Sequence, residues 1–333
     1  MSRPAISVAL PPSKDIVGYA QAAERLGYER MWLFDSPALY GDVWMALGRL
    51  AEQTSRIKLG TGVAVPSTRH PMVTAAAIAT VEDLSPGRLT VAFGTGFSAR
   101  KAMGQKPMKW SELATTIRQV RGLLAGEVVE IDGAACQLIH SPGFGPARPV
   151  TTPIWTAPSG PKGFAVSEEL GVDGVVLTAP PRSGEHQPWK SNALLVQGTV
   201  IQPGEDHTST RLFEAIGPLY ALNFHATWDM FREHLERVPG AVAWRDAMLA
   251  ARPEHERHLA VHEGHLCYMT ERDRRGVEAA GPAVLGHAWT GDAASVAARL
   301  DETGAAGIAE VILVPAGPDI PGELAAFAAA AAA

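Results

Sequence analysis

The chain of 333 residues has little of what marks several classes of protein. Its only cysteines are Cys136 and Cys267, far apart in sequence, which predicts reduced, buried thiols in a cytosolic protein rather than a disulfide framework. Charged residues make up 19%, and the net charge of -6 disfavours a nucleic-acid or anionic-membrane surface. No apolar run reaches the roughly 18 residues of a membrane span, and the N-terminal segment has no apolar signal-peptide core. We therefore expect a cytoplasmic protein without nucleic-acid or membrane partners.

The residues that are present are those of an ordinary globular domain. Hydrophobic residues make up 46%, and the 33 glycines and 25 prolines are spread along the chain. This length suits one large α/β domain or two ordinary ones, and we treat residues 1–333 as a single domain.

Short apolar runs alternate with amphipathic segments, which predicts strands followed by helices. Glycines or capping residues bound several helices: Gly27 ends the first, Asp42 begins the second, and Thr290 begins the last, which Gly304 ends. The segment 127–139 predicts a hairpin that turns at Asp132 and Gly133. Expected strands are 6–10, 31–34, 57–61, 89–93, 154–157, 172–177, 200–202 and 311–314; expected helices are 16–26, 43–51, 71–83, 110–124, 161–171 and 293–304.

Six strand–helix units in the first half, with one more at the end, predict a (β/α)8 TIM barrel. The strands are rich in Val, Ile and Leu, as in a parallel sheet buried on both faces. Residues 178–286 are less regular, with helical stretches at 209–249 and 257–277, and we interpret them as a large insertion within the barrel. The alternative is a doubly wound open sheet.

Glycines stand where the expected strands end, and ligands of α/β folds sit at that edge. Residues 94–99 match the dinucleotide-binding pattern G-x-G-x-x-A, but that site needs a helix opening at the glycines. Residues 98–107 resemble a loop instead. We interpret Thr95 and Gly96 as a strand end that presents bare backbone to a flat ring, with a plain tight turn as the alternative.

A second glycine follows another expected strand. Ser159, Gly160 and Pro161 stand between that strand and a helix, where free N–H groups favour a phosphate. Lys162 strengthens this prediction, and an ordinary strand–helix turn is the alternative.

Several polar residues are candidates for chemistry. Asp35 ends the second strand and could orient a ring N–H or assist proton transfer, or else simply cap a helix. His262, Glu263 and His265 lack the spacing of the zinc-protease motif and an evident third ligand, so we predict no metal. They could instead form a polar cluster near a substrate or a solvated patch, and His225, among aromatic residues, is similarly open.

Taken together, the motifs resemble the luciferase-like monooxygenase superfamily over about two thirds of the chain. The resemblance rests on residues 22–28, 32–35, 54–63, 69–71, 84–88, 94–96, 153–161, 171–177 and 290–314.

The resemblance implies a (β/α)8 barrel that binds a flavin-type ring at the carboxyl ends of its strands. One branch of the superfamily uses reduced FMN and oxygen. The other uses the deazaflavin coenzyme F420 for hydride transfer, as in methylene-tetrahydromethanopterin reductases, and residues 157–161 are similar to its phosphate site. The family's non-prolyl cis peptide would fall at Gly62-Val63. Members are commonly dimers, so we expect a homodimer.

The chain departs from the sugar-phosphate dehydrogenases of that branch at two positions. Ser36 replaces a histidine after the second strand, and Phe97 replaces a glutamate after the fourth. The acid–base group would then come from elsewhere, with Asp35, His225 and Glu263 as candidates.

The sequence therefore leads to an F420-dependent oxidoreductase that acts on a small organic substrate. An FMN-dependent monooxygenase and an inactive flavin-binding barrel are the alternatives. The residues expected to bind the coenzyme are Asp35, Thr61, Gly62, Val63, Thr95, Gly96, Ala157, Ser159, Gly160, Pro161 and Lys162. Those expected to shape the substrate pocket are Phe97, Trp228, His262 and His265, with His225 beside them.

Overall fold

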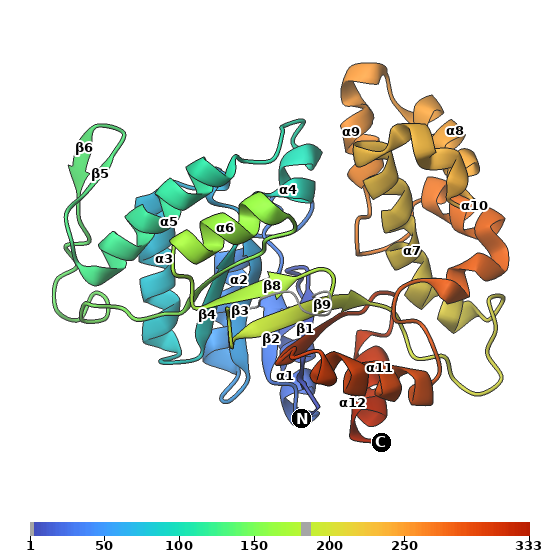
Figure 1. The fold of residues 1–333 in the computed structure, drawn as a ribbon, viewed down its shortest axis with the longest axis horizontal. Helices are drawn as coiled ribbons and strands as arrows, with labels where there is room; N and C mark the ends of the chain where they lie inside the picture. The colour runs from blue at the N-terminus through green and yellow to red at the C-terminus, as the bar shows by residue number, and fades with distance from the viewer. Residues whose placement is uncertain (1–2, 181–187) are drawn as a thin grey trace.

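A closed barrel of parallel strands organises the molecule (Figure 1). The computed structural model describes residues 3–180 and 188–333. Around the barrel the strands run β1-β10-β9-β8-β7-β4-β3-β2, and every neighbouring pair is parallel. This confirms the predicted (β/α)8 barrel, and the doubly wound alternative is wrong. Residues 181–187, within the expected insertion, lie outside the described residues.

Most of the barrel strands are followed by a helix along the chain. The strands are β1 (Ala5–Leu10), β2 (Arg30–Leu33), β3 (Lys58–Ala64), β4 (Leu89–Phe93), β5 (Val129–Ile131), β6 (Ala134–Cys136), β7 (Ile154–Thr156), β8 (Gly174–Leu177), β9 (Asn192–Gln197) and β10 (Glu310–Val314). The helices are α1 (Ile16–Arg25), α2 (Val43–Gln53), α3 (Pro71–Leu84), α4 (Phe97–Ala102), α5 (Trp110–Ala125), α6 (Pro161–Glu169), α7 (Thr210–Met230), α8 (Ala241–Ala251), α9 (Arg257–His262), α10 (Glu271–Ala280), α11 (Ala293–Ala305) and α12 (Ile320–Ala332).

Tryptophan fills the inside of the barrel, and a glycine on the neighbouring strand makes room for it. Trp32 on β2 is fully buried and lies beside Trp155 on β7, with ring centroids 5.6 Å apart. A Cβ atom added at Gly60 would lie 2.5 Å from Cε3 of Trp32. The barrel is therefore a packed core, and ligands are confined to its ends.

Two of the local predictions are confirmed in detail. The Asp42 carboxylate caps α2 by accepting hydrogen bonds from the N–H groups of Trp44 and Met45, at 2.9 and 3.0 Å. The hairpin β5–β6 turns at Asp132 and Gly133, whose φ angles of 52° and 79° are those of a two-residue hairpin turn.

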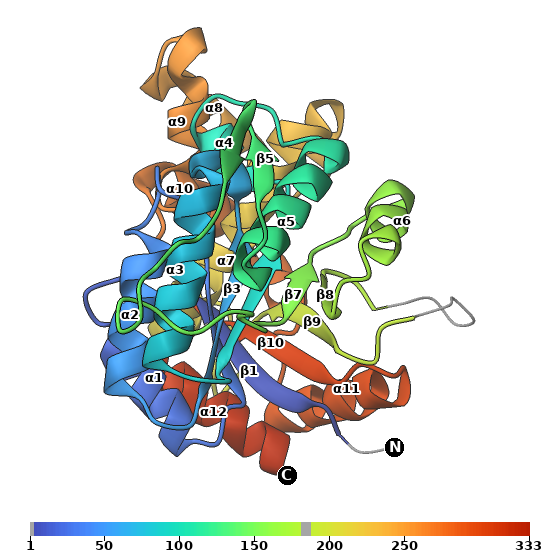
Figure 2. The same cartoon turned by 90° about the vertical axis from the view of Figure 1, so that its left-hand side faces the viewer.

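Strand seven was predicted in the wrong place. It is β9, which ends at Gln197, whereas residues 200–202 contribute only an isolated bridge between Val200 and Gly291. The helical insertion therefore begins after β9 and not at residue 178. Helices α7 to α10 gather around a core of their own at one end of the barrel, with Phe224 and Trp244 fully buried in it (Figures 1 and 2).

The two ends of the insertion are joined by backbone hydrogen bonds, and we call residues 197–201 with 289–291 the insertion neck. The Trp289 N–H donates to the Gln197 carbonyl at 2.8 Å, and the Ile201 N–H donates to the Gly291 carbonyl at 2.9 Å. Gly198 lies against this contact, because a Cβ atom there would be 2.6 Å from the backbone carbon of Trp289.

Three smaller predictions are corrected. Asp292, not Thr290, caps α11, accepting from the Ser295 N–H at 2.8 Å, and the helix continues past Gly304 to Ala305. The thiols are not buried: Cys136 is partly exposed and Cys267 is exposed.

No helix among the described residues is long and apolar enough to cross a membrane.

Candidate functional site

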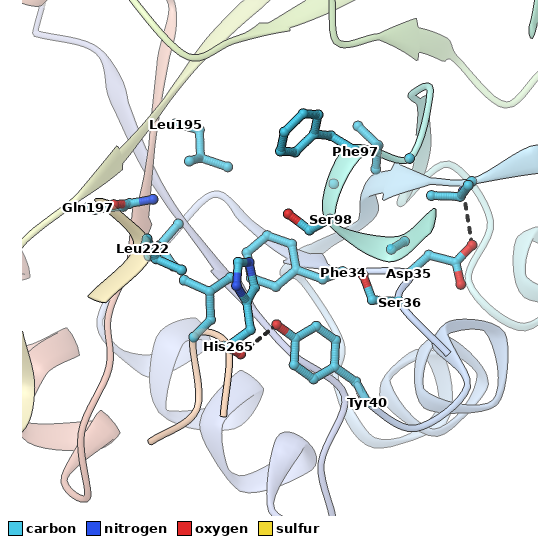
Figure 3. A pocket seen from close by; sticks show the side chains of 17 residues that line it. Phe34, Asp35, Ser36, Tyr40, Phe97, Ser98, Leu195, Gln197, Leu222 and His265 are labelled. Atoms are coloured by element: carbon cyan, nitrogen blue, oxygen red, sulfur yellow. Dashed lines mark hydrogen bonds between the residues drawn. The ribbon is translucent and has the colours of Figure 1, made fainter. Parts of the chain in front are cut away.

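A cavity of about 260 Å³ opens at the carboxyl ends of β2, β3, β9 and β10 (Figure 3). Helices α4 and α7 and the loop that contains His265 form its other walls. Apolar side chains dominate the lining, and a few polar groups come from Asp35, Ser36, Ser98, Gln197 and His265. A mostly apolar cavity with few polar groups is typical of a small-molecule site. Its other lining residues are Phe34, Tyr40, Gly62, Val63, Val65, Gly96, Phe97, Ala99, Leu195, Leu222, Leu266 and Val314.

Six of the residues predicted for the site line this cavity. They are Asp35, Gly62, Val63, Gly96, Phe97 and His265. The other predicted residues lie elsewhere. Thr61 is fully buried, and its hydroxyl donates to the Ala92 carbonyl at 3.0 Å. Thr95 is the neighbour of Gly96, and its carbonyl accepts from the Met108 N–H at 2.9 Å.

The Asp35 carboxylate is buried and fully engaged. Its Oδ2 accepts from the Val65 N–H at 2.9 Å, and Arg69 donates to the same oxygen at 2.7 Å. Arg69 also donates to Asp42 at 2.7 Å. These bonds fix the end of β3 against the loop after β2, so the geometry favours a positioning role for Asp35 over proton transfer.

The end of β3 carries the cis peptide that the resemblance implied, between Gly62 and Val63. The glycines around it make room for the protein's own side chains. A Cβ atom at Gly94 would lie 2.5 Å from Val63, and one at Gly96 would lie 2.5 Å from Val65. These glycines therefore let the two valines pack closely, and the valines form the wall of the cavity.

A helix opens at Gly96, where a loop was predicted. Gly96 has a φ of 76°, and α4 begins at the next residue, Phe97. The closed barrel, rather than the absence of a helix, is what excludes the dinucleotide-binding interpretation. Lys101 in α4 lies 3.6 Å from the Asp229 carboxylate of α7, which joins this wall of the cavity to the insertion.

The predicted phosphate segment follows β7, next to β4 in the barrel, and lies outside the cavity lining. Gly160 is the N-cap of α6, no side chain among the described residues caps this helix, and Pro161 and Lys162 are exposed. A Cβ atom at Gly160 would meet nothing within 4 Å. The helix therefore presents open backbone, as a phosphate group requires. The start of α6 and the cavity both lie at the carboxyl ends of the barrel strands.

Three histidines of the insertion form a cluster. The rings of His225, His262 and His265 have centroids 5.5 to 6.2 Å apart. Only His265 lines the cavity, beside Leu222 and Phe34 (Figure 3). His225 is buried behind it and joins it to Asp273.

The remaining predicted residues lie away from the cavity. Trp228 packs on Trp244 in the core of the insertion, and Arg232 covers its outer face at 3.8 Å. Glu263 is exposed and pairs with Arg272 at 2.6 Å. His262 is buried, with Nε2 3.3 Å from Asp229. Within the described residues, no group of His, Cys, Asp or Glu side chains could hold a metal ion.

Sequence reasoning missed Gln197, Tyr40 and Asp273. Gln197 ends β9 and would have followed from a correct placement of strand seven. His287 holds it, with Nε2 3.3 Å from the Gln197 side-chain oxygen, and burial lowers the pKa of His287 to about 4. The Tyr40 hydroxyl donates to the His265 carbonyl at 2.7 Å, which fixes the loop that contains His265. Burial raises the pKa of Tyr40 well above its usual value. A local signal for Asp273 is the capping box that it forms with Thr270.

Comparison with known proteins gives a consistent result. The family model described as luciferase-like monooxygenase matches residues 2–310. The chain is 35% identical over 179 residues to a 5,10-methylenetetrahydromethanopterin reductase of Methanolobus tindarius, covering 50% of this chain and 51% of that one. It is 32% identical over 184 residues to an F420-dependent glucose-6-phosphate dehydrogenase of Beutenbergia cavernae, covering 50% and 53%. The matched regions thus span about half the length of these curated relatives.

Solved structures are similar over nearly the whole chain. A coenzyme F420 dependent tetrahydromethanopterin reductase from Methanopyrus kandleri has a TM-score of 0.64 at 20% identity, covering 98% of both chains. An F420-dependent secondary alcohol dehydrogenase has a TM-score of 0.66 at 15% identity, covering 99% of this chain and 98% of that one. At these identities the likeness shows the fold.

Proposed function

Because the chain belongs to the luciferase-like monooxygenase family, we propose that it is an oxidoreductase that binds coenzyme F420 and transfers a hydride between it and a small organic substrate. The cavity at the carboxyl ends of the barrel strands carries this proposal, since it is mostly apolar and has an open helix N-terminus nearby. The relatives named as F420-dependent support the choice of coenzyme.

In this proposal the ring lies in the cavity, against Gly62, Val63 and Gly96. Val63 and Val65 supply an apolar wall, and Phe97 on α4 and Leu195 on β9 add further apolar lining. The cavity volume of about 260 Å³ suits a ring rather than a whole coenzyme, so the rest of the molecule would extend outside it. The coenzyme supplies the hydride chemistry, and the protein supplies orientation and electrostatics.

The phosphate of the coenzyme would bind at the start of α6. Ser159 and Lys162 flank Gly160 and Pro161 there, and the exposed Lys162 ammonium adds positive charge to the helix N-terminus. Ala157 directly follows β7, the strand that leads into this segment.

Equilibrium binding of F420 and of FMN, each in both redox states, tests the proposal. We expect the wild-type protein to bind F420 more tightly than FMN. Preference for reduced FMN would point to the monooxygenase alternative, and binding of neither would contradict the proposal.

A double variant tests whether the phosphate of the coenzyme binds at the start of α6. The double variant S159A/K162Q should weaken F420 binding at least fivefold, because it removes a hydroxyl and a charge from the helix N-terminus. K58Q is the matched control, since Lys58 is an exposed lysine at the start of β3, the opposite end of the strand from the cavity. Equal affinity of the double variant and the control would place the phosphate elsewhere.

A further inference from the structure

A line of hydrogen-bonding groups runs from the cavity into the core of the insertion, and we call it the histidine relay. It consists of His265 on the loop between α9 and α10, His225 on α7 and Asp273 on α10. Nδ1 of His265 lies 3.2 Å from Nδ1 of His225, and Nε2 of His225 lies 3.2 Å from Oδ1 of Asp273. Only His265 reaches the cavity, so the other two groups act through it.

The buried end of the relay is an ionised carboxylate. Oδ1 of Asp273 accepts from Nε1 of Trp244 at 2.9 Å, and Oδ2 accepts from the N–H and the hydroxyl of Thr270 at 2.9 and 2.7 Å. Burial alone would raise the pKa of Asp273, but the hydrogen bonds from His225 and Thr270 and the charge of His225 lower it overall. A carboxylate surrounded by donors can only accept, so Nε2 of His225 must carry a proton.

This requirement sets the tautomers of both histidines. When His225 is neutral, its Nδ1 is a bare acceptor, and Nδ1 of His265 must donate to it. Nε2 of a neutral His265 is then left with a free lone pair. Among the described residues none hydrogen-bonds to that nitrogen, and the imidazole lines the cavity. The cavity therefore contains a base.

The loop holds this imidazole in one place. Gly264 has a φ of 77°, and a Cβ atom there would lie 2.6 Å from the Tyr268 carbonyl, so only glycine fits. Leu266 also has a positive φ, of 63°. The Tyr40 hydroxyl holds the His265 carbonyl, and the ring stacks on His225 at 5.5 Å and 23°.

We propose that His265 is the acid–base residue of this active site, and that His225 and Asp273 form the pair behind it that takes up and returns the proton. The inference rests on the proposed function, because the hydride needs the deazaflavin coenzyme as its acceptor or donor. Asp35 and Glu263, the other candidates from the sequence, are an engaged structural carboxylate and an exposed ion-paired one.

The step balances for a substrate with a hydroxyl group. In the oxidative direction the C–H hydride leaves with its two electrons to the oxidised coenzyme, the O–H bond breaks and a C=O bond forms. The hydroxyl proton goes to Nε2 of His265, and the Nδ1 proton of His265 passes to Nδ1 of His225. His225 then carries two protons beside the Asp273 carboxylate, and the reductive direction runs in reverse.

Burial and the nearby imidazoles of His225 and His262 lower the pKa of His265 well below its usual value. A proton that reaches His265 is therefore passed on rather than stored. Other titratable groups also surround the relay. Tyr40 reaches it from the loop after β2, and Cys267 and Tyr268 lie on the loop that carries His265. His262 on α9 packs against His265, with Asp229 and Lys101 behind it.

NMR of the full chain with ¹⁵N-labelled histidine tests the relay without coenzyme or substrate. The His265 signals are assigned by their loss in H265Q, with H258Q on α9 as the matched control, because His258 is partly buried but lies outside the relay. At pH 7.5 we expect a neutral His265 with a protonated Nδ1 and a bare Nε2. The opposite tautomer, or a doubly protonated His265, would overturn the proposal.

Kinetics separate proton uptake from positioning. An amide at position 225 can donate to Asp273 and accept from His265, but it cannot take up the proton. With a hydroxyl substrate of the wild-type enzyme, H225Q and H265Q should each lower kcat about 100-fold or more, within the range of general acid–base catalysis. H225Q should leave F420 affinity unchanged, because His225 lies behind the cavity lining. If kcat of H265Q stayed within threefold of the wild-type value, the proposed role of His265 would be overturned. If the wild-type protein did not bind F420 at all, the proposed function would be contradicted, and the NMR result on the relay would still be valid.

Discussion

At the scale of single residues, the site depends on polar groups that are fully engaged. Asp35 illustrates this, because its sequence position at a strand end predicts a place at the cavity but not what it does there. Its partners, Val65 and Arg69, come from the segment that follows β3, some thirty residues away, and only the fold brings them together.

The first prediction concerns this carboxylate. D35A leaves the buried Val65 N–H without an acceptor and removes one of the two carboxylate partners of Arg69, so it should lower the free energy of unfolding by about 2 kcal/mol. Urea unfolding measures this loss. R69Q should reproduce most of this loss of stability, because Arg69 joins Asp35 to Asp42, and an R69Q variant as stable as the wild type would contradict the prediction.

The second prediction concerns acid stability. Burial lowers the pKa of His287 to about 4 in the folded chain, whereas an exposed histidine titrates near 6.5. The unfolded chain therefore binds the proton first, and stability is lost as the pH falls from about 6.5 to 4, by on the order of 3 kcal/mol at the limit. H287Q should make this part of the profile shallower in urea unfolding at several pH values. H255Q, at an exposed histidine, serves as the control, and identical profiles for H287Q and wild type would refute the prediction.

At the scale of elements, periodicity and caps predict the barrel well and the insertion poorly. Strand seven was misplaced because the segment 193–201 contains two apolar runs separated by Gly198, and both have strand-forming residues. The pairing of β9 with β8 and β10 selects the first run. Helix α4 was missed because six residues show no helical periodicity, and its contacts with α9 stabilise it.

The candidate site was predictable in part for the same reason. Residues at strand ends, such as Gly62 and Gly96, follow from the strand assignment. The histidine relay does not, since His225 and Asp273 are 48 residues apart on different helices, and their pairing exists only after the insertion has packed.

The third prediction tests the insertion neck. G198A places a methyl group 2.6 Å from the Trp289 backbone, at a φ of 148°, so it should lower the free energy of unfolding by about 2 kcal/mol. G160A is the control, because that position has open space and a φ of −158°, and it should change stability by less than about 0.5 kcal/mol. Chemical denaturation measures the stability of both variants. If G198A were as stable as G160A, the backbone of the neck would move to accept the methyl group, and the prediction would be wrong.

At the scale of the whole molecule, the barrel and the insertion meet at the cavity, and a ligand there contacts both. Strands β2, β3 and β9 form one side, and α7 and the His265 loop form the other. A bound coenzyme should therefore stabilise the two parts together.

The fourth prediction follows from this arrangement. At a concentration one hundred times its Kd, F420 should raise the free energy of unfolding by about 2.7 kcal/mol. Thermal unfolding followed by circular dichroism measures the shift, and it should grow with ligand concentration. A shift confined to one of two separate transitions would mean that the ligand contacts only one part.

The insertion neck has an evolutionary consequence. Because its incoming and outgoing backbones are hydrogen-bonded to each other, residues between Gly198 and Gly291 form a cassette that could be exchanged without moving β9 or α11. This cassette carries Leu222 and His265, which face the cavity, and the buried pair behind them. One recombination event could thus give a descendant both a new lining of the cavity and a new set of buried polar groups behind it, on a barrel that had not changed.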